Sequence, residues 1–377
     1  MAHGHMIPTV DMARLFARRG AWNQFQVSTK ATIVSTSLNA PIFSKTIERD
    51  RQLGLDISIH NIKFPSAEGG LPEGCENLSS LTSPDMFPTF LKAIGMLQQP
   101  LEKLLEECHP SCVVADMMFP WATEAANKLG IPRRYEPHKG VDSDFEPFVV
   151  PGLPDQITLT RSQLPTFIRE GTENELTKLM DEISQSIVKS YGVFTNSFVE
   201  LEPAYSEHYR MEINRKTWHV GPLSLCNRDM KDKAERGNLS SSDEHECMRW
   251  LAKKNPNSVL YICFGSYFNH PAAQLLEIAM DLEASGHNFI WVIGIGVGAQ
   301  EWSRCEQKLI VSKEAIEKAI TQLMAGEEAE ETRNRAKVLK EMARRATDGG
   351  GSSYCDLTAF LEELRDLETS KQECAAD

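Results

Sequence analysis

The sequence predicts an α/β fold in which two groups of parallel strands are joined by a polar connector. Short, apolar, β-branched runs alternate with helical patterns along most of the chain, which is typical of parallel sheets covered by helices. Residues 225–246 are highly charged and nearly free of large apolar side chains, so we interpret them as the connector. The 377 residues suffice for two to three domains of about 150 residues. We assign residues 1–224 to the first domain and 247–377 to the second.

The first domain is expected to open with a helix. Pro8 suits a first helical turn, Val10, Ala13 and Phe16 recur at helical spacing, and Gly20 supplies a stop signal. Further helices are expected over 88–107 and 121–129. The apolar and β-branched runs predict strands over 32–36, 56–62, 111–116 and 192–197.

The second domain repeats the strand–helix–strand pattern. Strands are expected over 258–264 and 288–293, with a helix over 271–285 between them. Amphipathic patterns predict helices over 312–321 and 327–346, the latter with Glu/Arg pairs four residues apart. Gly349–Gly351 ends that helix, and Ser353 with Asp356 forms the capping box of a last helix over 354–367.

The composition narrows the class of protein. A net charge of −13 argues against a nucleic-acid partner, because the phosphates would repel the chain. No apolar run approaches the roughly 20 residues that a membrane span needs, and the first residues do not resemble a secretion signal. The nine cysteines are odd in number and form no Cys-x-x-Cys pair, which favours a reducing compartment. We therefore expect a cytoplasmic protein.

His5 and Asp116 are the candidate catalytic residues. His5 precedes the first predicted helix, and Asp116 ends a predicted strand, where ligand crevices of parallel sheets lie. If the two elements are neighbours, the carboxylate can accept a hydrogen bond from the imidazole and fix its tautomer, so that His5 becomes a general base. A lone histidine and a lone aspartate are more often structural, and spacing alone leaves that alternative open.

Six segments of the chain resemble one enzyme family. Together they are similar to the plant UDP-sugar-dependent glycosyltransferases of the GT-B type, and most similar to the glucosyltransferases that act on flavonoids and related phenolics. Each match is short, but the six are spread over most of the length of the chain. The segments are Met1–Pro8, Cys112–Ala122, Asn196–Pro203, His219–Pro222, Ser258–Ser266 and Gly350–Leu357.

The resemblance implies a fold and a reaction. The fold would be GT-B-like, with two Rossmann-like domains facing each other across a cleft and both parallel sheets incomplete. The last helix, from about Ser353, would fold back across the domain junction. The reaction would move a hexose, glucose by preference, from a UDP-sugar to a phenolic hydroxyl with inversion, in a monomer that uses no metal or other cofactor. His5 would deprotonate the acceptor, Asp116 would support His5, and Gly265 and Ser266 would bind the leaving diphosphate.

The family's donor-binding box has no counterpart here. Trp291-Val292-Ile293 is followed directly by Gly294–Trp302, which resembles the stretch beyond that box. The tryptophan that stacks on uracil, the histidine on the diphosphate and the Asp-Gln pair on the sugar are therefore missing. An alternative is that the chain is a non-catalytic protein that binds small molecules without binding the donor.

Two further motifs suggest other chemistry. The pattern G-x-G-x-x-A, typical of dinucleotide binding, is satisfied by Gly294, Gly296 and Ala299. Two acidic or polar residues follow it where a helix would be expected to begin. A dehydrogenase is therefore a distant alternative. Asp142-Ser143-Asp144 resembles an Asp-x-Asp metal motif, but it lies in an acidic loop with no strand before it, which favours a solvated turn.

His3 and His5 could hold a transition metal near the amino terminus. Two ligands close to a chain end make a weak site, so we expect no resident metal.

Overall fold

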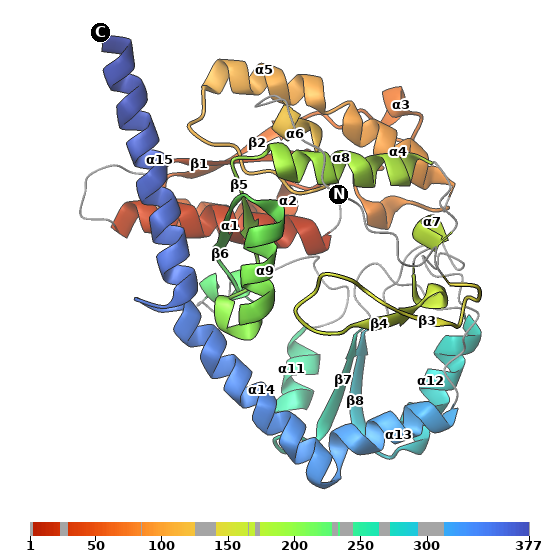
Figure 1. Ribbon diagram of the computed structural model, residues 1–377. Coiled ribbons are helices and arrows are strands. Elements are labelled where there is room, and N and C mark those ends of the chain that lie inside the picture. The colour runs from red at the N-terminus through yellow and green to blue at the C-terminus, as the bar shows by residue number, and fades with distance from the viewer. Residues whose placement is uncertain are drawn as a thin grey trace.

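The computed structural model describes residues 3–22, 29–83, 85–124, 141–164, 166–169, 174–227, 233, 244–263, 272–292 and 313–376. It confirms the α/β class. Within the described residues the strands form three parallel pairs and one short antiparallel pair (Figure 1). The strands are β1 Ala31–Thr36, β2 Ile57–Ile62, β3 Pro147–Val149, β4 Thr158–Thr160, β5 Gly192–Thr195, β6 Lys216–His219, β7 Val259–Cys263 and β8 Asn288–Val292.

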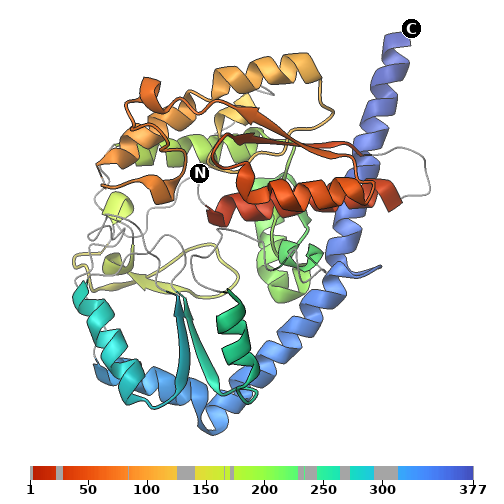
Figure 2. The same ribbon diagram turned by 180° about the vertical axis from the view of Figure 1, so that it is seen from behind.

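Helices connect and cover these pairs (Figures 1 and 2). None of the described helices combines the length and apolarity needed to cross a bilayer. The α-helices are α1 His3–Trp22, α2 Pro41–Gln52, α3 Ser66–Gly69, α4 Met86–Gly95, α5 Gln98–Cys108, α6 Trp121–Glu124, α7 Thr166–Arg169, α8 Glu175–Lys189, α9 Pro203–Ile213, α11 Glu244–Ala252, α12 Ala272–Ala284, α13 Lys313–Met324, α14 Gly326–Thr347 and α15 Ser352–Ala376. Short 3-10 turns are η1 Leu78–Ser80, η3 Arg161–Gln163, η4 Val199–Leu201 and η5 Leu223–Cys226.

The first parallel pair is built from β1 and β2. Ala31 is paired with Ile57 at one end of the ladder and Thr36 with Ile62 at the other. Helix α1 packs its apolar side on this pair, and α2 completes the same core. The buried members of this core are Met6, Val10, Ala17, Ile33, Phe43, Ile47 and Ile57.

Helix α1 begins earlier than the sequence predicts. It starts at His3, so Pro8 lies inside the helix and His5 lies in its first turn, not ahead of it. Proline has no backbone N–H and therefore removes one intrahelical hydrogen bond, which would have gone to the Gly4 carbonyl. The Thr9 hydroxyl donates to the His5 carbonyl at 2.9 Å. Packing of Met6 and Val10 on the β1–β2 pair stabilises the additional turn despite the proline.

A buried polar network fixes α1 to its neighbours. Arg14, which is 1% exposed, donates through Nε and Nη2 to the Asp50 carboxylate of α2 and through Nη1 to the Asn227 side chain after η5. Asn227 in turn donates to Asp11 Oδ1 at 3.0 Å. Arg18 adds a bond to Asp50 at 2.9 Å. Because buried charges are costly unless paired, this network holds α1 in one position.

Two sequence predictions in the first half of the chain are wrong. The helix expected over 88–107 is two helices, α4 and α5, with a break at residues 96–97. The strand expected over 111–116 is not a strand, although its residues are apolar and β-branched. A strand needs a hydrogen-bonding neighbour, and in the described residues this segment has none.

The remaining predicted elements are present, most with shifts of one to three residues at their ends; the last helix, expected over 354–367, runs on to Ala376. β7 and β8 form the predicted parallel pair, with Val259 opposite Asn288, and α12 lies between them in sequence. Their core comprises Leu260, Ile278, Leu282 and Ile320. Helix α6 starts at the predicted position, but residues 125–129 lie outside the described residues, as does most of the predicted connector 225–246.

The last helix packs on the first half of the chain. In both views α14 and α15 run from the β7–β8 pair to the level of β5 and β6 (Figures 1 and 2). Phe360 of α15 lies between three aromatic rings, with centroids 4.7 Å from Phe194, 5.0 Å from Trp218 and 5.8 Å from Phe16. The expected return of the last helix is therefore present. The domain boundaries themselves stay a prediction.

Neighbouring serines at the start of α15 allow a matched test of this packing. Ser353 is buried and donates to the Gly221 carbonyl at 2.7 Å, whereas Ser352 donates to Glu200 at the surface, also at 2.7 Å. We expect Ser353→Ala to lower the free energy of unfolding by about 1–3 kcal/mol, because the Gly221 carbonyl is left buried and unpaired. Ser352→Ala should change it by about 0.5 kcal/mol or less. Urea denaturation of both variants checks this; equal effects would contradict it.

Candidate active site

His5 and Asp116 form a hydrogen-bonded pair. His5 Nδ1 lies 2.9 Å from Asp116 Oδ2 and 3.1 Å from Oδ1. The histidine side chain is 43% exposed and the aspartate side chain 20% exposed, so a ligand can approach the imidazole. The structure thus brings the two predicted residues together, although neither occupies the predicted position at the end of a helix or strand.

A tight turn orients Asp116. Its Oδ1 accepts a hydrogen bond from the Met118 backbone N–H at 3.0 Å, and its carbonyl accepts one from Phe119 N–H at 3.0 Å. These bonds form a local turn just before α6, and they hold the carboxylate toward α1. Aspartate suits this position because its short side chain can bond to the backbone two residues later.

The pair has the chemistry of a general base and its supporting carboxylate. An ionised carboxylate accepts hydrogen bonds but cannot donate them. In the bond to Asp116 the neutral imidazole must therefore be the donor, so Nδ1 carries its proton. The lone pair is then on Nε2, and a nitrogen with a lone pair can take a proton from a ligand hydroxyl. The negative charge of Asp116 also stabilises the imidazolium that this transfer produces.

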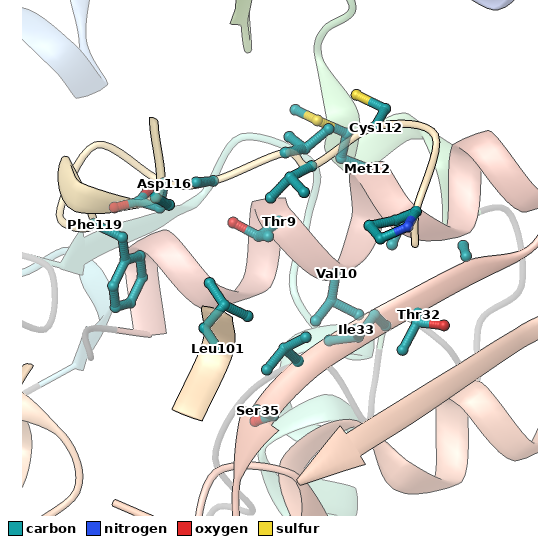
Figure 3. Close-up of a pocket in the computed structure, with 18 of the residues that line it drawn as sticks. Thr9, Val10, Met12, Thr32, Ile33, Ser35, Leu101, Cys112, Asp116 and Phe119 are labelled. Atoms are coloured by element: carbon teal, nitrogen blue, oxygen red, sulfur yellow. The ribbon is translucent and has the colours of Figure 1, made fainter. Parts of the chain in front are cut away.

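A cavity of about 1120 Å³ adjoins the pair. Figure 3 shows it between α1, β1, α5 and the segment 110–116, with Asp116 and Phe119 near one end. Apart from the His5–Asp116 end, its middle is lined by aliphatic side chains. These include Met6, Val10, Ala13, Ile33, Leu101 and Leu104. Pockets for small molecules typically have volumes of about 300–1,000 Å³ and apolar walls with few polar groups.

The predicted donor-binding residues lie outside the described residues. This holds for Gly265 and Ser266, which follow β7, and for the stretch 293–302 after β8 with its G-x-G-x-x-A pattern. Their roles stay predictions.

Two motifs of the sequence are candidate metal sites, namely Asp142-Ser143-Asp144 and His3 with His5. Asp144 faces Arg161, with 3.6 Å between carboxylate and guanidinium, as expected for a solvated turn. No cluster of three or more His, Cys, Asp or Glu side chains suited to a metal ion occurs among the residues that the structure describes, including His3 and His5.

Sequence reasoning missed the cavity and the network around Arg14. The leucines of α5 follow helical spacing, which predicts a buried face but not an empty volume beside it. Asp11, Arg14 and Arg18 lie three and four residues apart on α1, a spacing that indicates one polar face. Their partners are distant in sequence, so the pattern could not show that this face is buried.

Solved structures of plant UDP-glycosyltransferases share this fold, which is of the GT-B type. A UGT of Glycyrrhiza uralensis, crystallised with glycyrrhetinic acid 3-O-monoglucuronide, matches 100% of this chain and 96% of its own at a TM-score of 0.86 and 31% identity. A Medicago truncatula UGT complexed with UDP-glucose matches at a TM-score of 0.71, with 96% of each chain covered and 16% identity, which supports the fold alone.

Two curated relatives place the chain in a family. It is 42% identical to scopoletin glucosyltransferase of Nicotiana tabacum and 40% identical to anthocyanin 3'-O-beta-glucosyltransferase of Gentiana triflora. Both comparisons cover 97% of this chain and 96% of the relative. No family model matches the chain. With relatives of this similarity over nearly the full length, the chain belongs to the plant UDP-glycosyltransferase family.

Within the aligned region, the relatives contain more residues than this chain. The comparison with the tobacco enzyme spans 466 positions, more than the 377 residues of the whole chain. Because it reaches almost both ends of both proteins, the tobacco enzyme has internal residues without a counterpart here.

Proposed function

We propose that this chain transfers glucose from UDP-glucose to a hydroxyl of a small phenolic, with His5 as general base. The observation that carries the proposal is the His5–Asp116 pair at the end of an apolar cavity, in a chain whose relatives are named as glucosyltransferases of scopoletin and anthocyanin. A planar phenolic suits the aliphatic walls, and its hydroxyl can reach Nε2.

The reaction is a single displacement. His5 Nε2 removes the acceptor proton as the oxygen attacks the anomeric carbon, and UDP leaves with the bonding electron pair. One displacement inverts the anomeric configuration. Gly265 and Ser266 would donate hydrogen bonds to the departing diphosphate, whose negative charge such donors stabilise.

The direct test is sugar transfer to a coumarin or flavonol hydroxyl. The purified chain is incubated with millimolar UDP-glucose and scopoletin or quercetin, and the glucoside is identified by mass spectrometry and by the configuration of its anomeric proton in NMR. We expect a β-glucoside from α-linked UDP-glucose. Absence of product at millimolar donor, with the chain folded by circular dichroism, would contradict the proposal.

We expect UDP-glucose to bind more weakly than in the micromolar range. The residues expected to stack on uracil and to bind the sugar hydroxyls have no counterpart that we recognise in the sequence, and hydrogen bonds from Gly265 and Ser266 would contribute on the order of 1–3 kcal/mol. A micromolar complex requires about −8 kcal/mol after association costs. Isothermal titration calorimetry measures this affinity directly, and a micromolar dissociation constant would show that other residues replace the missing box.

A second candidate function is phenolic binding without catalysis. The internal residues that the tobacco relative has and this chain lacks favour it, since they fit the loss of the donor box. Retention of a phenolic together with no transfer at any donor concentration would select this function over the first. We further propose a cytoplasmic monomer, and size-exclusion chromatography with light scattering tests the oligomeric state.

A further inference from the structure

The sequence contains an arginine pair that is followed, two positions later, by a hydroxyl residue. Residues 344–347 read Arg-Arg-Ala-Thr. The other arginine pairs, 18–19 and 133–134, are followed at the same position by alanine and by glutamate. Protein kinases select substrates by charge pattern, and a kinase with an acidic groove binds arginines that lie shortly ahead of the acceptor hydroxyl. Thr347 therefore occupies the acceptor position of a basic kinase substrate.

The fold presents this segment at the surface. Helix α14 ends at Thr347, and its joint with α15 lies at the edge of the molecule in both views (Figures 1 and 2). Arg344 and Arg345 are exposed, and Thr347 is partly exposed. Arg344 forms a surface ion pair with Glu341 at 3.3 Å. Because a surface pair of this kind contributes about 1 kcal/mol or less, the carboxylates of a kinase groove can replace Glu341 at little cost.

The Thr347 hydroxyl is bonded only weakly to its own helix. It shares its proton between the Ala343 and Arg344 carbonyls, at 3.3 Å and 3.0 Å. Both bonds lie within the last turn of α14, and terminal turns are the part of a helix that opens most readily. The hydroxyl is the donor in both bonds, so the lone pairs of its oxygen remain for attack on phosphorus.

The chain after Thr347 suits the extended shape that a kinase groove requires. Asp348 is already extended, with φ −77° and ψ 166°, and three glycines follow it. A Cβ at Gly349 or Gly350 would meet no atom within 4 Å, so neither residue packs tightly against a neighbour. The deeply buried side chain of the last turn is the single methyl group of Ala346. Unwinding this turn therefore removes little apolar surface from the core.

A phosphate on Thr347 would weaken the joint between α14 and α15. The bridging oxygen of phosphothreonine carries no proton, so both bonds to the helix carbonyls are lost. About two negative charges would then lie next to Asp348 at the negative end of the α14 dipole. Helix α15 begins with a bond from Ser352 to the Glu200 carboxylate of η4, and η4 also packs on α14. Arg344 can neutralise part of the new charge only by leaving Glu341.

We propose that Thr347 is a phosphorylation site for a protein kinase that selects basic substrates, and that the phosphate loosens the α14–α15 joint. The Thr347 oxygen attacks the γ-phosphorus of ATP as the bond to the β-phosphate oxygen breaks. ADP leaves with the bonding electron pair, and the hydroxyl proton passes to a carboxylate of the kinase. The inference goes beyond the proposed function, because it depends on neither His5 nor a sugar donor.

Phosphorylation of the purified chain tests the site. The folded chain is incubated with Mg-ATP and the catalytic subunit of protein kinase A, and the modified residue is located by tandem mass spectrometry. We expect phosphate on Thr347 and none on Thr369. The latter is an exposed helical threonine that donates to the Arg365 carbonyl at 3.1 Å but follows Asp366 and Leu367 in place of arginine. A chain that is not modified at Thr347, or is modified there only after heat unfolding, would overturn the proposal.

Variants show whether the arginines select the site. Arg344→Gln and Arg345→Gln should each lower kcat/KM for phosphorylation of Thr347 at least about tenfold, because each removes a charge that the kinase groove binds. Arg335→Gln is the matched control, since Arg335 is an exposed arginine on the same helix, and it should leave kcat/KM unchanged. Equal rates for the three variants would show that the charge pattern does not direct the kinase to Thr347.

Amide hydrogen exchange measures the effect of the phosphate. Exchange over residues 345–352 should be about tenfold faster in the fully phosphorylated chain, while that of α12 stays unchanged. Thr347→Val, treated with kinase in the same way, should gain neither the phosphate nor the faster exchange. Unchanged exchange in a fully phosphorylated chain would overturn the loosening of the joint. These assays contain no UDP-glucose and no phenolic, so their failure leaves the sugar-transfer test untouched, and the reverse also holds.

Discussion

Replacing His5 by alanine should reduce the turnover number for glucoside formation by about 10³-fold. A positioned general base typically contributes 10²–10⁴-fold, and in the proposed reaction the imidazole of His5, bonded to Asp116, removes the acceptor proton. The measurement is the initial rate at saturating phenolic and fixed, millimolar UDP-glucose. His60→Ala is the matched control, because His60 is an exposed histidine on β2. It should retain the original rate.

The double variant separates a functional pair from two independent residues. If Asp116 acts through His5, Asp116→Asn should lower the rate on its own, but it should lower the rate of His5→Ala no further. If the fold-loss in rate of the double variant equals the product of the fold-losses of the two single variants, Asp116 does not act through the imidazole. A His5→Ala chain with unchanged activity would remove His5 from the mechanism altogether.

Replacing Asp50 by alanine should lower the free energy of unfolding by about 3–5 kcal/mol, as expected when one partner of a buried ion pair is removed. Arg14 would keep Asn227 and the more distant Asp11 carboxylate, 3.9 Å away, but it would lose both bonds to Asp50. Urea denaturation followed by circular dichroism measures the change. Because the network holds α1, exchange of the α1 amides should also rise in this variant.

The control for Asp50 lies on the same helix. Glu48 is 56% exposed and forms a surface ion pair with Arg51 at 3.4 Å. Glu48→Ala should therefore change the free energy of unfolding by about 1 kcal/mol or less. Similar effects of the two substitutions would mean that the buried network contributes little to holding α1.

The sequence predicts best those elements whose partners are close along the chain. The β7–β8 pair and the helix between them differ from the prediction by at most one residue at each end, because apolar runs, helical periodicity and a short connection all lie within one stretch. The segment 111–116 shows the limit of such patterns. Its valines favour a strand, but pairing is decided by a neighbour in space, and β1 lies across the cavity from it.

The candidate site was predicted in part, by position and by family resemblance. His5 and Asp116 were expected to meet, and they do, although His5 lies inside α1 and Asp116 ends a segment that is not a strand. The cavity could not be foreseen, since it lies between elements that are distant in sequence, namely α1, β1, α5 and the segment 110–116, and no local pattern encodes such an arrangement. The Arg14–Asn227 bond joins residues that are 213 positions apart, so only the folded chain reveals it.

The position of Phe360 between Phe16, Phe194 and Trp218 has a consequence for folding during synthesis on the ribosome. Phe16, Phe194 and Trp218 are synthesised first, and Phe360 is added only 142 residues after Trp218. At about 5–20 residues per second, the nascent chain exposes an unfinished aromatic cluster for on the order of ten seconds. During that interval, chaperones that recognise apolar surface have their best opportunity to bind, and premature termination anywhere before α15 would leave the amino-terminal half with a permanently open core.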